Sequence, residues 1–195
     1  DWMRRAASWS EEENRRDAAA LAAMLRAVAE CPRPVVARVH GNAYGGGVGL
    51  VAAADLAVAA ATAQFAFTEV RLGLAPATIA PHVVEKIGPG WALRLFLTGE
   101  RIGAEEALRI GLVYRVVPPA ELDAAVEGVV RTLLAGGPQA QAACKELVRR
   151  VARERGAQVD DYTARLIAAL RTGPEGQEGI LSFLEKRRPR WASEG

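Results

Sequence analysis

The spacing of apolar residues divides this chain into two stretches with different patterns. Over residues 1–117, short apolar runs of strand length alternate with helical periods. From residue 118 onward the strand signals vanish and helical periods fill the chain. We therefore expect an α/β core over residues 1–117 and a helical segment over residues 118–195.

Start and stop signals set the bounds of the expected elements. Ser10 and Glu13 have the spacing of a capping box, so a helix begins there and continues until the prolines at 32 and 34 stop it. A second expected feature is the apolar loop over residues 72–81, which contains two prolines and which we expect to line a pocket. The other expected elements are strands over residues 35–39, 56–60, 65–67 and 112–117, and helices over residues 82–87, 90–97, 104–110, 119–134, 138–153, 159–170 and 175–186.

The strongest chemical signal is a glycine run between an apolar strand and an apolar helix. Residues 41–55 read GNAYGGGVGLVAAAD. Bare N–H groups at a helix start bind a phosphate, or an oxygen that becomes negative during a reaction. The carboxylate of Glu69 follows in FAFTEVRLGL, and this combination suggests proton chemistry next to a carbonyl.

Other glycine motifs compete with this interpretation. A plain tight connection explains the glycines alone equally well. The spacing does not match the Gly-x-Gly-x-x-Gly pattern of dinucleotide sites, and the absence of Gly-Lys-Ser/Thr excludes a Walker loop.

Composition and charge exclude several other classes. Half of the residues are hydrophobic and a quarter are charged, as in ordinary globular domains. A net charge of +2 is too small to indicate nucleic-acid binding, and we expect no membrane span and no signal peptide. Cys31 and Cys144 form neither a metal pattern nor a disulfide framework, which favours a cytoplasmic protein without a metal. His40 and His82 lack a nearby nucleophile motif, so we interpret them as structural.

Five segments in a fixed order resemble the enoyl-CoA hydratase/isomerase superfamily, also called the crotonase superfamily. The resemblance covers nearly the whole chain and is strongest to bacterial 3-methylglutaconyl-CoA hydratase-type proteins. It implies an α/β fold, a spiral of ββα units with a helical C-terminal segment used in trimer formation, and trimers that often pair into hexamers. The segments are residues 34–47, 55–60, 63–76, 97–113 and 183–191.

The resemblance also implies roles for individual residues. Gly46 would donate one N–H to the thioester oxygen of an acyl-CoA, and Glu69 would move the proton. A second donor would belong to an upstream segment before Asp1. Family hydratases typically carry a second glutamate at the position of Gly49, which is a departure in this sequence. Coenzyme A is part of the substrate, and no separate cofactor is expected. The residues expected to contact the substrate are Ala43, Tyr44, Gly45, Gly47, Thr68, Leu72, Pro76, Ala77 and Lys186.

Three functions remain open at this point. Hydration divides naturally between two carboxylates, whereas double-bond isomerisation needs only one base, which favours isomerisation for Glu69 alone. The surrounding motifs favour a hydratase, which we take as the leading hypothesis. A non-catalytic acyl-CoA-binding protein is the third. An arginine at the position of Arg71 more often forms a structural ion pair, and a contact with a substrate carboxylate is the alternative. Lys186 or Arg187 is a candidate for contacting coenzyme A phosphates.

Overall fold

The computed structural model describes residues 2–192 and forms two compact units. The described residues up to Cys31, together with Val35–Val126, form the first unit. Pro32–Pro34 and the described residues from Glu127 onward form the second. The division falls inside α6 (Leu122–Leu134). The boundary expected from the change in sequence pattern stays a prediction.

The first unit opens with α1 (Trp2–Ala6) and α2 (Glu11–Glu30). The capping box is confirmed: the Ser10 hydroxyl accepts a hydrogen bond from the Glu13 N–H at 3.3 Å, and the Glu13 carboxylate accepts one from the Ser10 N–H at 2.7 Å. The helix ends directly before the Cys-Pro-Arg-Pro segment, as expected. Leu25 on α2 is completely buried, so this face of the helix packs on the core.

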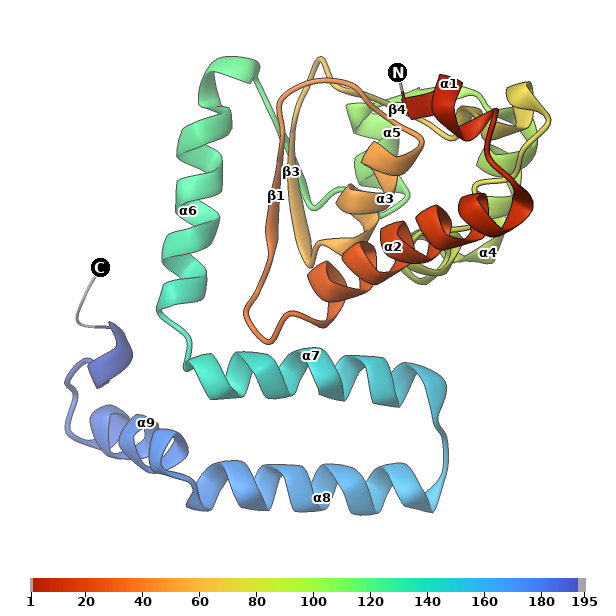
Figure 1. Cartoon of the computed structure of the whole chain (residues 1–195). Coiled ribbons are helices and arrows are strands. Elements are labelled where there is room, and N and C mark those ends of the chain that lie inside the picture. Colours follow the sequence, from red (N-terminus) through yellow and green to blue (C-terminus); the bar gives the residue numbers. More distant parts are fainter. Residues whose placement is uncertain (1, 193–195) are drawn as a thin grey trace. The chain divides into compact units, whose positions relative to one another are not determined.

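A parallel sheet forms the centre of the first unit. Its strands are β1 (Val36–Val39), β3 (Leu56–Ala60) and β6 (Arg115–Val117), in the order β1-β3-β6. The central strand β3 has the sequence LAVAA and is almost entirely buried, as central parallel strands usually are. Figure 1 shows α2, α3 (Gly46–Ala53) and α5 (Ala104–Arg109) on the same side of the β1–β3 pair.

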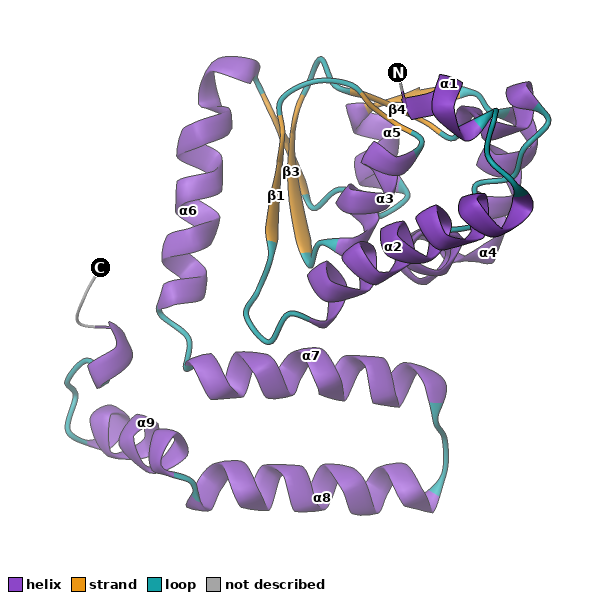
Figure 2. Ribbon diagram, viewed as in Figure 1, coloured by secondary structure: helices purple, strands orange, loops and turns teal. Residues whose placement is uncertain are grey.

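A second sheet positions the glycine run. Its strands are β2 (Ala43–Tyr44), β4 (Gln64–Ala66) and β5 (Arg101–Gly103). β2 and β4 are parallel, whereas β4 and β5 are antiparallel. Figure 2 draws the strands in orange and the helices in purple, with β4 of this sheet labelled. Phe65 and Ile102 lie directly opposite each other in this sheet and are buried in the core.

Two helices connect these sheets to the remaining core. α3 (Gly46–Ala53) is apolar throughout and mostly buried, as expected for a helix without a polar face. α4 (Ala80–Thr98) has an interruption at Gly88, where φ is 76°. Its two halves confirm the two helices expected over residues 82–87 and 90–97. Between β4 and α4 the chain forms a short 3₁₀ helix, η1 (Thr68–Leu72), and a loop that is largely exposed except at Pro76 and Ile79.

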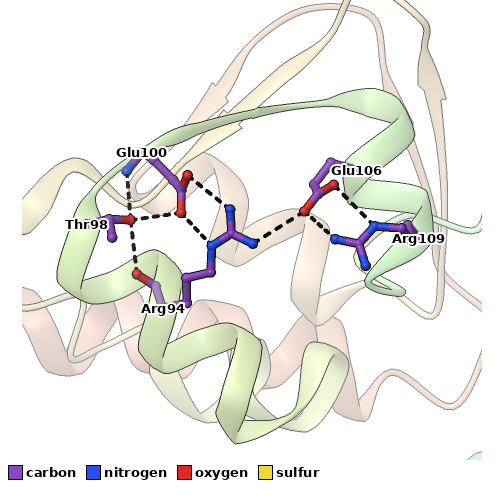
Figure 3. A network of polar contacts seen from close by, with 5 residues as sticks. All are labelled: Arg94, Thr98, Glu100, Glu106 and Arg109. Carbon is purple, nitrogen blue, oxygen red and sulfur yellow. Dashed lines mark hydrogen bonds and ion pairs between the residues drawn. The ribbon is translucent and has the colours of Figure 1, made fainter.

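A network of ion pairs joins the end of α4 to α5 on the surface (Figure 3). Arg94 pairs with Glu100 at 2.8 Å and approaches Glu106 at 3.7 Å, while Arg109 also pairs with Glu106. Hydrogen bonding to Arg94 lowers the pKa of Glu100, and hydrogen bonding to Arg109 lowers the pKa of Glu106. Both carboxylates therefore stay ionised near neutral pH and are poor candidates for moving protons.

The second unit consists of helices. α7 (Pro138–Arg153) and α8 (Ala157–Thr172) lie side by side and run in opposite directions, and α9 (Pro174–Leu184) follows (Figure 1). The Glu175 carboxylate accepts hydrogen bonds from the N–H groups of Gln139 and Ala140, which caps the start of α7. Two 3₁₀ turns complete the described elements, η2 (Pro119–Glu121) before α6 and η3 (Arg190–Ala192) after α9.

Candidate active site

The glycine run forms a sharp turn between β2 and α3. The Gly45 N–H donates a hydrogen bond to the Ala66 carbonyl at 3.0 Å, which extends the pairing of β2 with β4. Gly45 then adopts φ 53° and ψ −122°, a conformation that L-residues rarely adopt. This turn lets α3 begin immediately at Gly46, so the first helical N–H groups lie beside the strand end.

Two of these N–H groups are available to a ligand. Val48 and Gly49 donate back to the Gly45 carbonyl at 3.0 and 3.3 Å. Within residues 2–192, the N–H groups of Gly46 and Gly47 have no hydrogen-bond acceptor. A Cβ added at Gly46 would meet nothing within 4 Å, so this side of the turn is open. The turn can therefore offer paired donors and the positive end of α3 to a negative oxygen.

Glu69 lies against this turn. It belongs to η1, directly after β4, and its Oε1 is 3.3 Å from the position that a Cβ would take at Gly45. Its Oε2 is buried and has no hydrogen-bond partner among the described residues. Buried polar atoms are nearly always hydrogen-bonded, so an orphaned carboxylate oxygen points to a missing ligand. The structure thus brings together an anion-binding turn and a carboxylate with a free oxygen.

The flanking residues on β2 were also expected at the site. Ala43 is buried, and its Cβ is 3.8 Å from the position that a Cβ would take at Gly47. The Tyr44 hydroxyl donates a hydrogen bond to the Gln64 side-chain oxygen at 3.2 Å. The Arg101 guanidinium lies 5.4 Å from the centroid of the Tyr44 ring. Gln64 and Arg101 were not predicted from the sequence, because only the strand pairing brings them next to Tyr44.

The segment after β4 contains four more expected residues. Thr68 precedes Glu69 and is half-buried. Leu72 is 57% exposed and Ala77 is also exposed, whereas Pro76 is buried. A role for these residues at the acyl group, and for their loop as a pocket wall, stays a prediction.

Gly49 occupies a closed position one turn along α3. A Cβ built there would lie 3.0 Å from the Ile79 Cβ and closer still to its Cγ2 methyl. Ile79 is 2% exposed and immediately precedes α4. Sequence reasoning identified Gly49 as a departure but did not identify Ile79 as the residue against it, because the contact joins elements 30 residues apart.

The basic residues proposed for phosphate contacts have different environments. Lys186 follows α9 with φ 55°, a left-handed conformation that usually belongs to glycine. Arg187 is already engaged, since it pairs with Glu178 at 2.6 Å and with Glu185 at 2.6 Å. Arg71, the candidate for a substrate carboxylate, places its Nε 3.3 Å from the position that a Cβ would take at Gly99.

Two other kinds of site, a metal centre and a membrane-spanning helix, are absent from the described part of the chain. No three His, Cys, Asp or Glu side chains of residues 2–192 gather closely enough to hold a metal ion. None of the helices in the same range combines the length and apolar character that crossing a membrane requires.

Comparison with known proteins shows the family to which this chain belongs. The model of the family described as enoyl-CoA hydratase/isomerase matches residues 5–194. Carnitinyl-CoA dehydratase from Salmonella arizonae is 38% identical over 164 residues, which cover 82% of this chain and 63% of that protein. Enoyl-CoA hydratase ACTT6 from Alternaria alternata is 36% identical, over 84% of this chain and 55% of that protein. The chain thus spans less than two thirds of the length of these relatives.

Solved structures give the same result for the fold. An enoyl-CoA hydratase from Shewanella pealeana superimposes with a TM-score of 0.93 at 37% identity, covering 97% of this chain and 71% of that one. Pseudomonas aeruginosa AtuE superimposes with a TM-score of 0.94 at 39% identity, covering 98% of this chain and 74% of that one. The fold is the α/β crotonase fold, as expected. The chain belongs to the enoyl-CoA hydratase/isomerase family.

Proposed function

We propose that this protein adds water to an α,β-unsaturated acyl-CoA thioester. The observation that supports this function best is the orphaned Oε2 of Glu69, whose carboxylate packs against Gly45 directly before the open N–H groups of Gly46 and Gly47. Water addition to a conjugated thioester passes through an enolate-like state, whose negative charge collects on the thioester oxygen. Donors that meet this oxygen and a carboxylate that moves a proton are the two parts that such a reaction needs.

The proposed reaction assigns a task to each part of the site. The thioester oxygen accepts a hydrogen bond from the Gly46 N–H. Glu69 takes a proton from water as the water oxygen bonds to C3, the C2=C3 electrons move onto the thioester as an enolate, and Glu69 then gives a proton to C2. A single preorganised donor at such an oxygen typically lowers the barrier by about 3–4 kcal/mol. Glu69, as the proton carrier, adds about 100- to 10,000-fold in rate.

The names of the relatives support hydration. A carnitinyl-CoA dehydratase is 38% identical to this chain, and proteins named enoyl-CoA hydratase are 32–36% identical. Dehydration and hydration are the same reaction in opposite directions. The second candidate is double-bond isomerisation, which the glycine at position 49 favours because it leaves fewer carboxylates at the turn. Isomerisation would use the same enolate, with Glu69 taking a proton from one carbon and returning it to another.

The finer assignments belong to the same proposal. The acyl group is 3-methylglutaconyl-like, and Arg71 would meet its distal carboxylate. Ala43, Tyr44, Gly45, Thr68, Leu72, Pro76 and Ala77 line the acyl end, and Lys186 meets a coenzyme A phosphate. The protein works without a separate cofactor, as a homotrimer or as a pair of trimers, in the cytoplasm.

The test is turnover of a panel of unsaturated acyl-CoAs, including 3-methylglutaconyl-CoA, with mass spectrometry of the products. A product heavier by one water, formed by the parent protein and lost in Glu69→Gln, is the expected result. Double-bond migration without a mass change would establish the isomerase instead. Binding without turnover, unaffected by Glu69→Gln, would refute both and leave a non-catalytic acyl-CoA-binding protein.

A further inference from the structure

Gly49 and Ile79 form a packed pair behind the glycine turn. Gly49 is buried on α3, one helical turn after Gly45, and its N–H donates to the Gly45 carbonyl. A Cβ at position 49 would lie 3.6 Å from Leu25 Cδ1 but only 3.0 Å from Ile79 Cβ, and closer still to Ile79 Cγ2. Real Cβ atoms essentially never approach other atoms so closely. No side chain larger than hydrogen fits at position 49 while Ile79 is in place.

This packing closes a position from which α3 could otherwise present an acid or base. Position 49 lies one turn along the helix from Gly45, the residue against which the Glu69 carboxylate packs. The sequence of α3 is GGVGLVAA, so the helix supplies no proton-carrying side chain at any position. Glu100 and Glu106, two other carboxylates of the first unit, are held in ion pairs by Arg94 and Arg109.

We propose that the Gly49–Ile79 pair determines the mechanism, because it excludes a second carboxylate and leaves Glu69 as both base and acid. This inference rests on the proposed hydration. Ionised Glu69 takes a proton from water through one oxygen, the water oxygen bonds to C3, and the C2=C3 electrons pass to the thioester. Glu69 then returns a proton to C2 and is ionised again, so atoms and charge balance without another group. The two oxygens suit this exchange, because Oε2 has no partner among the described residues and Oε1 faces the turn.

The first test is a thermal double-mutant cycle on the packing itself. Gly49→Ala, Ile79→Ala and the double variant are compared with the parent by their melting temperatures. Gly49→Ala should lower the melting temperature clearly when Ile79 is present, and far less in the Ile79→Ala background, where the clashing Cγ2 is gone. Equal losses in the two backgrounds would show that Ile79 does not close position 49, and would overturn the proposal.

The second test is the pH dependence of hydration, which a purely structural pair would not alter. With one carboxylate, kcat should rise with pH through a single ionisation and then level off, whereas separate acid and base groups produce a bell-shaped pH profile. A folded Gly49→Glu/Ile79→Gly variant should show a bell-shaped pH profile of kcat in place of the single rise. A bell in the parent, or a single limb in that variant, would contradict the proposal. If the parent hydrates none of the acyl-CoAs, the proposed function is refuted. The double-mutant cycle of melting temperatures would still test whether Ile79 closes position 49.

Discussion

Gly45→Ala tests whether the turn that holds Glu69 depends on a bare glycine. Gly45 has φ 53°, and a Cβ there would come within 3.3 Å of Glu69 Oε1. Holding an L-residue in such a sparsely populated backbone region costs about 1–3 kcal/mol. A chain of this size loses about 2–4 °C in melting temperature per kcal/mol, so we expect a drop of about 2–12 °C. Acyl-CoA turnover should also fall, even at temperatures where the variant is fully folded. The reason is that the Glu69 carboxylate must move away from the new methyl group.

Gly41→Ala is the matched control for this experiment. Gly41 belongs to the same glycine-rich segment, yet its φ is not positive and a Cβ there would meet nothing within 4 Å. Its melting temperature and turnover should stay close to those of the parent. The assays are thermal unfolding followed by circular dichroism, and turnover of an unsaturated acyl-CoA. Equal melting temperatures and equal turnover for the two variants would refute the account of the turn.

Three further variants separate stability from function. Gly46→Ala should keep or raise the melting temperature, since its Cβ meets nothing within 4 Å and alanine favours the helix. Turnover should fall, because the methyl group occupies the substrate side of the turn. Unchanged turnover would contradict the placement of the thioester there. Lys186→Gly should raise the melting temperature by about 2–4 °C, because glycine adopts the left-handed conformation without strain. It should also weaken acyl-CoA binding measured by calorimetry, and an unchanged affinity would contradict the proposed phosphate contact. Hydrogen bonding to Arg187 lowers the pKa of Glu178 from 4.5 to about 2, so its stabilisation is complete above about pH 4.5 and is lost as the pH falls toward 2. As the pH falls through that range, the melting temperature of Glu178→Gln should therefore decrease less than that of the parent. Equal decreases in the two proteins would show that the ion pair does not contribute to stability.

Local signals in the sequence predicted most of the helices and the larger strands. The capping box at Ser10 defined the start of α2, and the bounds of α7 agree at both ends with those expected. These signals are local, because a cap or a helix-stopping proline acts through its own neighbours. β2 and β5 were missed, since strands of two or three residues are too short to show an alternating pattern and form only by pairing with β4.

The candidate site was predictable only in part, because some of its features are local in the sequence and others depend on long-range packing. The glycine turn and Glu69 could be identified because their chemistry is unusual for their positions in the sequence. Their contact, and the burial of Oε2, depend on how η1 folds back on β2. The closure of position 49 by Ile79 depends on packing between α3 and the start of α4, which no pattern in a single sequence encodes. The engagement of Arg187 by Glu178 likewise requires the turn after α9.

The most direct test of the central claim is hydrogen exchange at C2 of a 3-hydroxyacyl-CoA in heavy water. In the proposed reaction the glycine turn stabilises a thioester enolate and Glu69 moves the C2 proton. The parent protein should therefore introduce deuterium at C2, and Glu69→Gln should slow this exchange by about 100-fold or more. Exchange at equal rates in the parent and in Glu69→Gln would show that another group moves the proton, and would contradict the account.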